Sequence, residues 1–143
     1  MKASIFMAAA LAGAGTPALA RSVIGTVPAH GGRLVAISPQ LPDSSLSTAE
    51  KDALTFDVLS DIGKAVARLC GLVCALPEEL CAMLPSNNKA LPAINGDESR
   101  ERPVPATSNV ARNGGVAPAY LDVDYRKRLD PAAIVAGLRL AGA

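Results

Sequence analysis

Residues 47–84 read STAEKDALTFDVLSDIGKAVARLCGLVCALPEELCAML, and this stretch carries the clearest structural signal in the chain. Ser47 and Glu50 fit a capping box, in which the two side chains satisfy backbone N–H groups at a helix start. Apolar residues then recur at steps of three and four, within an arc of about 100° on a helical wheel. The stretch therefore predicts an amphipathic helix from about residue 48 to about residue 75. The large residues of its apolar stripe include Leu54, Val58, Ile62, Leu69 and Val73.

A second, shorter helix is predicted over residues 77–84. Pro77 ends the long helix because it lacks an N–H and disfavours helical geometry in the preceding residue. The same proline suits the first turn of a new helix, and the two glutamates after it face the positive end of that helix. The predicted fold class is therefore mainly α. It consists of one long amphipathic helix and a short fold-back helix over 47–84, with poorly ordered flanks.

The first 20 residues have the three parts of a secretory signal peptide. Lys2 is the positively charged start, residues 5–14 form the apolar core, and Ala18–Ala20 supplies small residues for cleavage. A membrane anchor would need roughly 18 or more apolar residues, and this run is interrupted sooner by glycines and a proline. We expect export to the periplasm or the cell exterior, with cleavage near Ala20.

The three cysteines lie close together, in the segment CGLVCALPEELC. In an oxidising compartment such a cluster favours a disulfide. Cys74–Cys81 is the favoured pair, and it would close an eight-residue loop worth roughly 2.5 kcal/mol in the chain-entropy model. Cys70–Cys81 is an equally simple pairing topologically. With Cys74 and Cys81 paired, the Cys70 thiol is left free or links two chains, and the helical hairpin is pinned by the disulfide.

The flanking segments carry weaker patterns. Residues 21–46 form an extended segment with two Val/Ile-rich runs around Gly31 and Gly32, for which we consider a hairpin. Residues 85–119 intersperse prolines with polar residues and show no period of 2 or 3.6, which predicts a disordered linker. Residues 120–143 end in Asp130-Pro131 and an apolar run, which predicts a short helix over 131–140.

Two sharper chemical interpretations of the cysteines are not favoured. A thioredoxin-type site places two residues between its cysteines at a helix N-terminus, whereas Cys70 and Cys74 have three between them and fall near the end of the predicted helix. A zinc site would need the three cysteines together with His30, from distant segments. His30, the single histidine, is most simply an exposed turn residue. The sequence thus predicts no catalytic residue, no metal ligand and no cofactor.

The net charge of the chain argues against nucleic acid as a partner. The chain has 14 Lys and Arg against 13 Asp and Glu, and Lys2 is the only charge in the signal, so the mature chain is nearly neutral. A neutral chain has no electrostatic footprint for nucleic acid. Asp122 and Asp124 are interpreted as a solvated strand face, and Arg126–Arg128 as a solvated helix entry.

The predicted function is a non-enzymatic exported helical protein that acts as a structural or protein-interaction module. Its apolar stripe would bind an unknown protein partner or a second copy of the chain. The alternative is a membrane-surface protein whose stripe lies in the lipid interface. That alternative is less favoured because the polar face has mixed charge and the mature chain has a single Phe.

Overall fold

The protein is described by a computed structural model and has a mixed α/β architecture. The structure describes residues 4–6, 25–51, 53–79, 92, 95–99, 101–111, 113–122, 124, 127 and 129–142. The helices are α2 (Thr26–Ala29), α3 (Pro42–Lys51), the 3-10 helix η1 (Ile62–Lys64), α4 (Ala65–Leu69) and α7 (Pro131–Gly142). The strands are β1 (Ser4–Phe6), β2 (Val35–Ser38), β3 (Asp57–Ser60), β4 (Val73–Ala75), β5 (Glu101–Pro103), β6 (Ala106–Val110) and β7 (Val116–Leu121).

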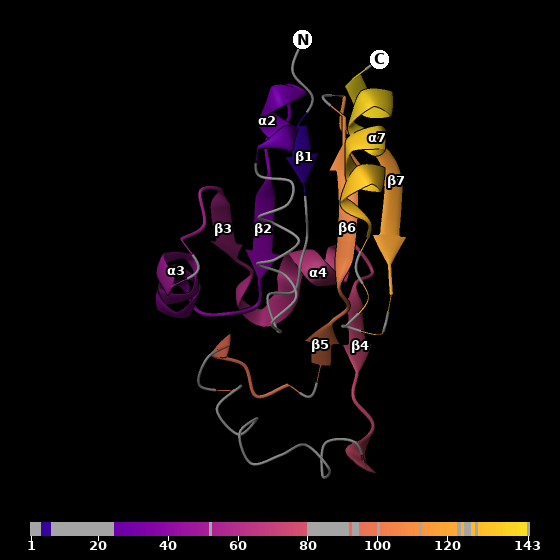
Figure 1. The fold of residues 1–143 in the computed structure, drawn as a ribbon. Helices are drawn as coiled ribbons and strands as arrows, with labels where there is room; N and C mark the ends of the chain where they lie inside the picture. The colour runs from indigo at the N-terminus through magenta and orange to yellow at the C-terminus, as the bar shows by residue number, and fades with distance from the viewer. Residues whose placement is uncertain are drawn as a thin grey trace.

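The strands form three small sheets. β1, β6 and β7 make an antiparallel sheet in the order β1-β6-β7, β2 and β3 form a parallel pair, and β4 and β5 form an antiparallel pair. Figure 1 shows β2 and β3 beside the three-stranded sheet, with α7 against β6 and β7 and α3 next to β3. Helices therefore flank the strands, as in α/β domains.

The parallel pair β2–β3 organises the first half of the chain. Parallel neighbours need a crossover connection, and α3, packed against β3, supplies it. The Ser45 and Ser60 hydroxyls lie 2.9 Å apart and join α3 to β3. The ladder extends one residue past the strands, where the Asp61 N–H donates to the Ser38 carbonyl oxygen at 2.7 Å.

The core lies where α7 and α2 meet the sheets. Its buried apolar side chains come from four parts of the chain: Val27, Leu34, Ala36, Ala106, Ile134 and Leu138. α7 starts as the sequence predicts for this segment, because Asp130 Oδ1 accepts the N–H of Ala132 at 2.7 Å and Pro131 occupies the first turn. α7 packs on β6, β7 and α2.

The predicted long helix over residues 48–75 is wrong, and so is the mainly α fold class. α3 ends at Lys51, and β3, η1, α4 and β4 follow within the same range. The backbone has positive φ at Ala53 (48°), Gly63 (71°), Lys64 (59°) and Gly71 (67°), a conformation that no α-helix accommodates. Pairing of β3 with β2 and β4 with β5 outweighs the helical periodicity of the sequence.

The apolar stripe is therefore not one helix face. Val58 and Val73 belong to strands β3 and β4, Ile62 belongs to η1, and Leu54 lies in the connection before β3. Leu69, at the end of α4, is 88% exposed. These residues point to different surroundings because a strand and a helix place successive side chains at different angles.

The flanks are more ordered than the sequence predicts. β5 and β6 and the start of β7 lie in the range predicted as a disordered linker. Residues 35–38 form a strand but pair in parallel with β3, while residues 26–29 form helix α2, so no hairpin joins the two. Most of the predicted fold-back helix, residues 80–84, and most of the predicted signal peptide lie outside the described residues. Within the described ranges, no helix is both long and apolar enough to cross a membrane.

Gly137 tests the packing of α7 on β6. A Cβ at this position would overlap the Asn109 Nδ2 atom, and Asn109 is 1% exposed. Gly137→Ala should lower the free energy of unfolding by about 1–3 kcal/mol through overpacking. In an Asn109→Ala background the same change should be neutral or stabilising, because Ala favours a helix interior over Gly by up to about 1 kcal/mol. Urea denaturation of the four proteins measures this coupling.

Gly25→Ala is the matched control for this experiment. Gly25 has φ −80° and nothing within 4 Å of a Cβ, so the change should have little effect. Equal destabilisation by Gly137→Ala in both backgrounds would show that α7 and β6 do not meet at these two residues.

Candidate functional site

The candidate site lies where η1 and α4 meet the segment that enters β5. Asp61 begins this region, and its carboxylate accepts the N–H groups of Val66 (2.9 Å) and Ala67 (2.8 Å). These are donors of the first turn of α4, which have no partner within the helix. Asp61 thereby anchors α4 to the C-terminal end of β3.

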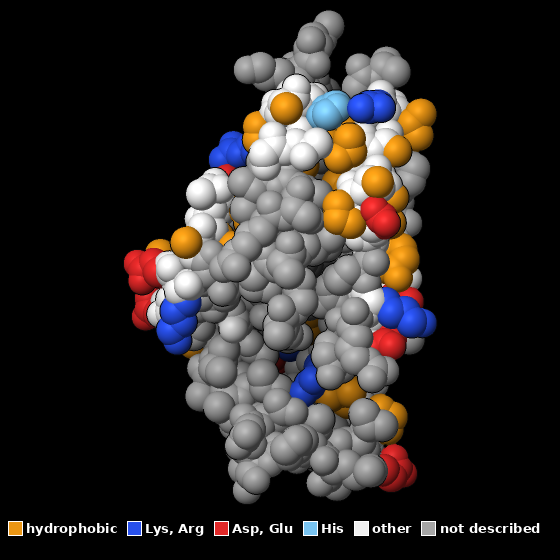
Figure 2. Space-filling view, in the orientation of Figure 1, with side chains coloured by type: hydrophobic (Ala, Val, Ile, Leu, Met, Phe, Trp, Pro, Cys, Tyr) orange, Lys and Arg blue, Asp and Glu red, His pale blue; other side chains and the backbone are white. Residues whose placement is uncertain are grey.

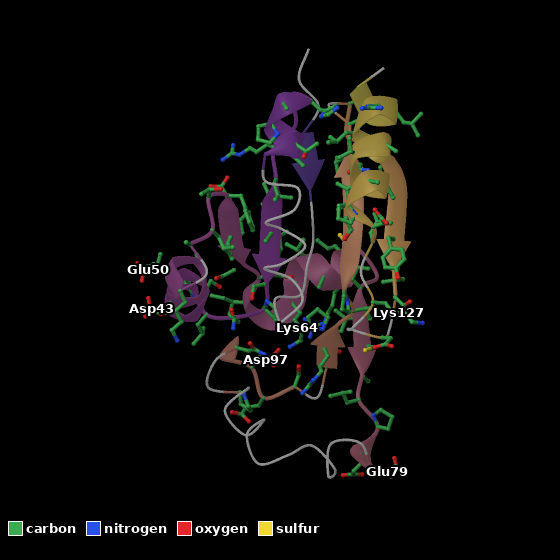
Figure 3. The ribbon with its side chains drawn as sticks, viewed as in Figure 1. Asp43, Glu50, Lys64, Glu79, Asp97 and Lys127 are labelled. Atoms are coloured by element: carbon green, nitrogen blue, oxygen red, sulfur yellow. The ribbon has the colours of Figure 1, made fainter. Side chains whose placement is uncertain are left out.

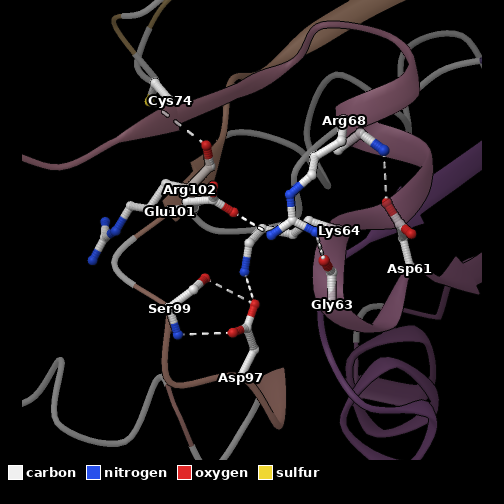
Figure 4. A network of polar contacts seen from close by, with 10 residues as sticks. Asp61, Gly63, Lys64, Arg68, Cys74, Asp97, Ser99, Glu101 and Arg102 are labelled. Carbon is white, nitrogen blue, oxygen red and sulfur yellow. Dashed lines mark hydrogen bonds and ion pairs between the residues drawn. The ribbon is translucent and has the colours of Figure 1, made fainter.

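Two ion pairs join this region to the segment around β5. The Lys64 ammonium pairs with Asp97, and the Arg68 guanidinium pairs with Glu101. We call these five charged residues, Asp61 included, the ion-pair cluster. Figure 4 shows the cluster from close by, and Figure 3 shows Lys64 and Asp97 facing each other while Asp43 and Glu50 point outward from α3.

The two pairs differ in burial and therefore in expected strength. The Lys64 side chain is 3% exposed and that of Asp97 is 16% exposed, whereas the Arg68 and Glu101 side chains are 49% and 34% exposed. Exposed pairs contribute roughly 0–1 kcal/mol, but removing one partner of a buried pair costs about 3–5 kcal/mol. Lys64–Asp97 is the pair that holds the segment in place.

Asp97 is bound firmly in its charged form. The hydrogen bond from Lys64, followed by one from the backbone N–H of Ser99 at 2.8 Å, lowers the pKa of Asp97 from 3.8 to about 2. The Ser99 hydroxyl donates a further hydrogen bond at 3.0 Å. The carboxylate is thus ionised throughout the neutral range and well below it.

Cys70 ends α4 in a Schellman motif. The Gly71 N–H donates to the Arg68 carbonyl oxygen at 3.0 Å, and the Leu72 N–H donates to that of Ala67 at 2.8 Å. Gly71 occupies the left-handed position that this motif requires (φ 67°). Cys70 is exposed with a free thiol, and it also lines a cavity of about 30 Å³.

Cys74 lies in β4, directly opposite Arg102 in β5. Its thiol is exposed and free, and it donates a weak hydrogen bond to the Arg102 carbonyl oxygen at 3.6 Å. Residues directly opposite in an antiparallel pair project from the same face of the sheet. The Nη2 atom of Arg102 is buried and has no hydrogen-bond partner.

The disulfide-pinned hairpin is wrong. The structure contains Cys70 and Cys74 as free thiols on separate elements, one at the end of α4 and one in β4. Cys74 therefore forms no disulfide in it. Cys81, the other member of the predicted pair, lies outside the described residues.

The remaining candidate residues lie on other elements than the two thiols. His30 ends α2, where its Nδ1 donates to the Thr26 carbonyl oxygen at 2.9 Å and its Nε2 lies 3.5 Å from Arg139 Nη2. Asp122 accepts from the Tyr120 hydroxyl at 3.3 Å and pairs with Lys127 at 3.7 Å. Within the described part of the chain, no three His, Cys, Asp or Glu side chains are grouped to hold a metal ion.

Sequence reasoning missed the partners that the ion-pair cluster brings together. The predicted long helix over residues 48–75 contains Asp61, Lys64 and Arg68, and charged residues within a helix pair with neighbours three or four positions away. Lys64 instead pairs with Asp97, 33 residues later. The sequence does contain a signal for these two ion pairs, because Lys64 and Arg68 have the same spacing of four as Asp97 and Glu101. Such a spacing is too common to identify a partner without the fold.

Comparison with known proteins identifies the fold. No protein-family model matches the chain, and no curated protein matches it in sequence. Solved structures do match, and they share a thioredoxin-like α/β fold. More narrowly, the fold is that of peroxiredoxins.

Three of these structures illustrate the match. Peroxidoxin BcpB from Mycobacterium tuberculosis has a TM-score of 0.67 and 15% identity over 96% of this chain and 78% of its own. The bacterioferritin comigratory protein of Xanthomonas campestris, described for alkyl peroxide reduction, has a TM-score of 0.67 and 14% identity over 98% of this chain and 78% of its own. The mitochondrial 2-Cys peroxiredoxin of Plasmodium falciparum has a TM-score of 0.65 and 14% identity over 98% of this chain and 75% of its own. Identities this low show the fold alone.

This fold overturns the predicted function. The predicted non-enzymatic helical module depended on one long apolar helix face, and that face is divided among strands and short helices. The fold is instead one used by peroxide-reducing enzymes, so the prediction that the chain is not an enzyme and its membrane-surface alternative both lose their basis.

Figure 2 shows side chains of both charges interspersed on one face, with no single-sign patch among the coloured residues.

The depressed pKa of Asp97 makes a stability prediction. Because Asp97 titrates at about 2 in the folded protein and at 3.8 ordinarily, the pair stabilises the fold fully above pH 3.8 and loses this contribution as the pH falls toward 2. The difference in unfolding free energy between the unsubstituted protein and Asp97→Asn should shrink by about 2 kcal/mol over that interval. Urea denaturation at several pH values measures it.

Glu101→Gln is the matched control at the exposed pair. It should change the unfolding free energy by less than about 1 kcal/mol at neutral pH. A difference between the unsubstituted protein and Asp97→Asn that stays constant from pH 5 to pH 2 would contradict the assigned role of Lys64.

Proposed function

We propose that this chain is a peroxiredoxin-like thiol protein that reduces peroxides through Cys74. The observation that carries the proposal is an exposed, free thiol on β4 of a peroxiredoxin fold, with an arginine directly across the sheet. The likeness spans 96–98% of this chain in the three structures compared. The alkyl peroxide reduction described for the Xanthomonas protein indicates the substrate class.

Cys74 is favoured over Cys70 as the attacking thiol. Reactive thiolates lie beside cations or at helix N-termini. Cys70 follows the last residue of α4, at the end of the helix that carries partial negative charge. Cys74 lies opposite Arg102, which keeps an unpaired buried N–H donor on Nη2. A donor of this kind can stabilise negative charge that develops on sulfur or on the peroxide oxygen.

The reaction proceeds in balanced steps. The Cys74 thiolate attacks one oxygen of ROOH, so that an S–O bond forms, the O–O bond breaks and ROH leaves after taking up a proton. The sulfur is oxidised to a sulfenic acid. The Cys70 thiol, four residues earlier, then attacks that sulfur, which forms a disulfide and releases water. Two molecules of a low-molecular-weight thiol then reduce this disulfide by thiol–disulfide exchange, which restores both cysteines and joins the two thiols in a disulfide of their own.

Cys74→Ser tests the attacking thiol. In the reduced protein treated with hydrogen peroxide or tert-butyl hydroperoxide, this variant should lose sulfenic acid at position 74 and slow peroxide consumption by roughly tenfold or more. Cys70→Ser should still form the sulfenic acid but no intramolecular disulfide. A dimedone-type probe with mass spectrometry locates the sulfenic acid, and the intact mass without reductant shows the disulfide.

Cys81→Ser is the control for this series, and it should react as the unsubstituted protein does. The proposal would be overturned if Cys74→Ser consumed peroxide as fast as the unsubstituted protein. It would also be overturned if the unsubstituted protein consumed peroxide no faster than free cysteine does.

A further inference from the structure

A second cavity lies at the other end of the β2–β3 pair from the thiols. Its volume is about 330 Å³, within the usual range for small-molecule pockets of about 300–1,000 Å³. It is formed by the residues that lead into β2 and β3, next to α2, while α4, β4 and β5 lie toward the opposite end (Figure 1). The residues used below are Pro28, Arg33, Leu34, Phe56 and Asp57.

An unusual ion pair forms the polar side of this cavity. Arg33 Nε donates to Asp57 Oδ2 at 3.0 Å, and Arg33 Nη2 donates to the same oxygen. Both bonds converge on one atom, so Arg33 Nη1 and Asp57 Oδ1 have no partner among the described residues. The pair therefore leaves one donor group of the guanidinium and one carboxylate oxygen available for a ligand without breaking.

The other side of the cavity is apolar. Leu34 is 5% exposed and forms part of the core, while Pro28 and the half-buried ring of Phe56 face the same space. A ligand that fits this surface needs an apolar body attached to a polar end.

We propose that this cavity binds a zwitterionic α-amino acid with an apolar side chain. Its carboxylate would accept from Arg33 Nη1, its ammonium group would donate to Asp57 Oδ1, and its side chain would lie against Leu34 and Phe56. A simple carboxylate is repelled by Asp57 and a simple amine by Arg33, so the pair selects a ligand that carries both charges. The Arg33 and Asp57 side chains are 73% and 47% exposed, so water screens the contacts and the affinity is millimolar.

The test is a backbone-amide NMR titration of the full chain with L-leucine. We expect saturable shifts at residues 33–34 and 55–57. N-acetyl-L-leucine lacks the ammonium group, L-leucine methyl ester lacks the carboxylate, and glycine lacks the side chain, so each should bind at least about tenfold more weakly. Arg33→Met and Asp57→Asn should weaken leucine binding to a similar extent.

Arg68→Met is the matched control, since it removes the arginine of another exposed arginine–carboxylate pair. It should leave leucine binding unchanged, and the amide spectrum of each variant shows whether it is folded. Equal binding of N-acetyl-leucine or the methyl ester, an equal loss in Arg68→Met, or no saturable shift with L-leucine would overturn the proposal. Because the cavity contains no cysteine, Cys74→Ser should bind leucine normally, which separates this result from the test of peroxide chemistry.

Discussion

The buried pair between the Lys64 ammonium and the Asp97 carboxylate is the constraint on which this structure depends most. A buried ammonium group is costly unless an anion neutralises it. Lys64 is buried at a turn where Gly63 and Lys64 both adopt left-handed backbone geometry. That geometry ends β3 and turns the chain into α4, while Asp97 brings in the segment that continues into β5. One pair thus joins two regions 33 residues apart and fixes the entry to the β4–β5 sheet.

This constraint also explains the surroundings of the two described thiols. The turn at Lys64 determines where α4 begins, and the Schellman motif at Gly71 determines where it ends, so Cys70 lies at a helix C-terminus and Cys74 continues into β4. In the described part of the chain no cysteine occupies the first turn of a helix, the position at which a helix favours a thiolate. Cys74 instead lies opposite Arg102, a cation on the neighbouring strand.

Local signals predicted part of the fold, and long-range pairing decided the rest. The start of α7 follows from Asp130 and Pro131, and the Val/Ile-rich run before Pro39 contains β2. A helix is predicted after Lys51 because Leu54, Val58 and Ile62 are spaced by four, which fits a helix. The same segment reads TFDVLS, which also fits a strand once β2 is available to pair with it.

Local sequence was enough to predict the start of α7 at Asp130 and Pro131 and the grouping of the three cysteines. The capping box predicted at Ser47 and Glu50 is wrong, because both residues lie inside α3. Folding over long range decided that residues 57–60 are a strand, that Lys64 pairs with Asp97, and that Cys74 lies opposite Arg102 in the β4–β5 ladder. The physical reason is that a cap or a turn is stabilised by atoms within a few residues. A strand, a buried charge or a cross-sheet neighbour is stabilised only by atoms that folding brings from elsewhere in the chain.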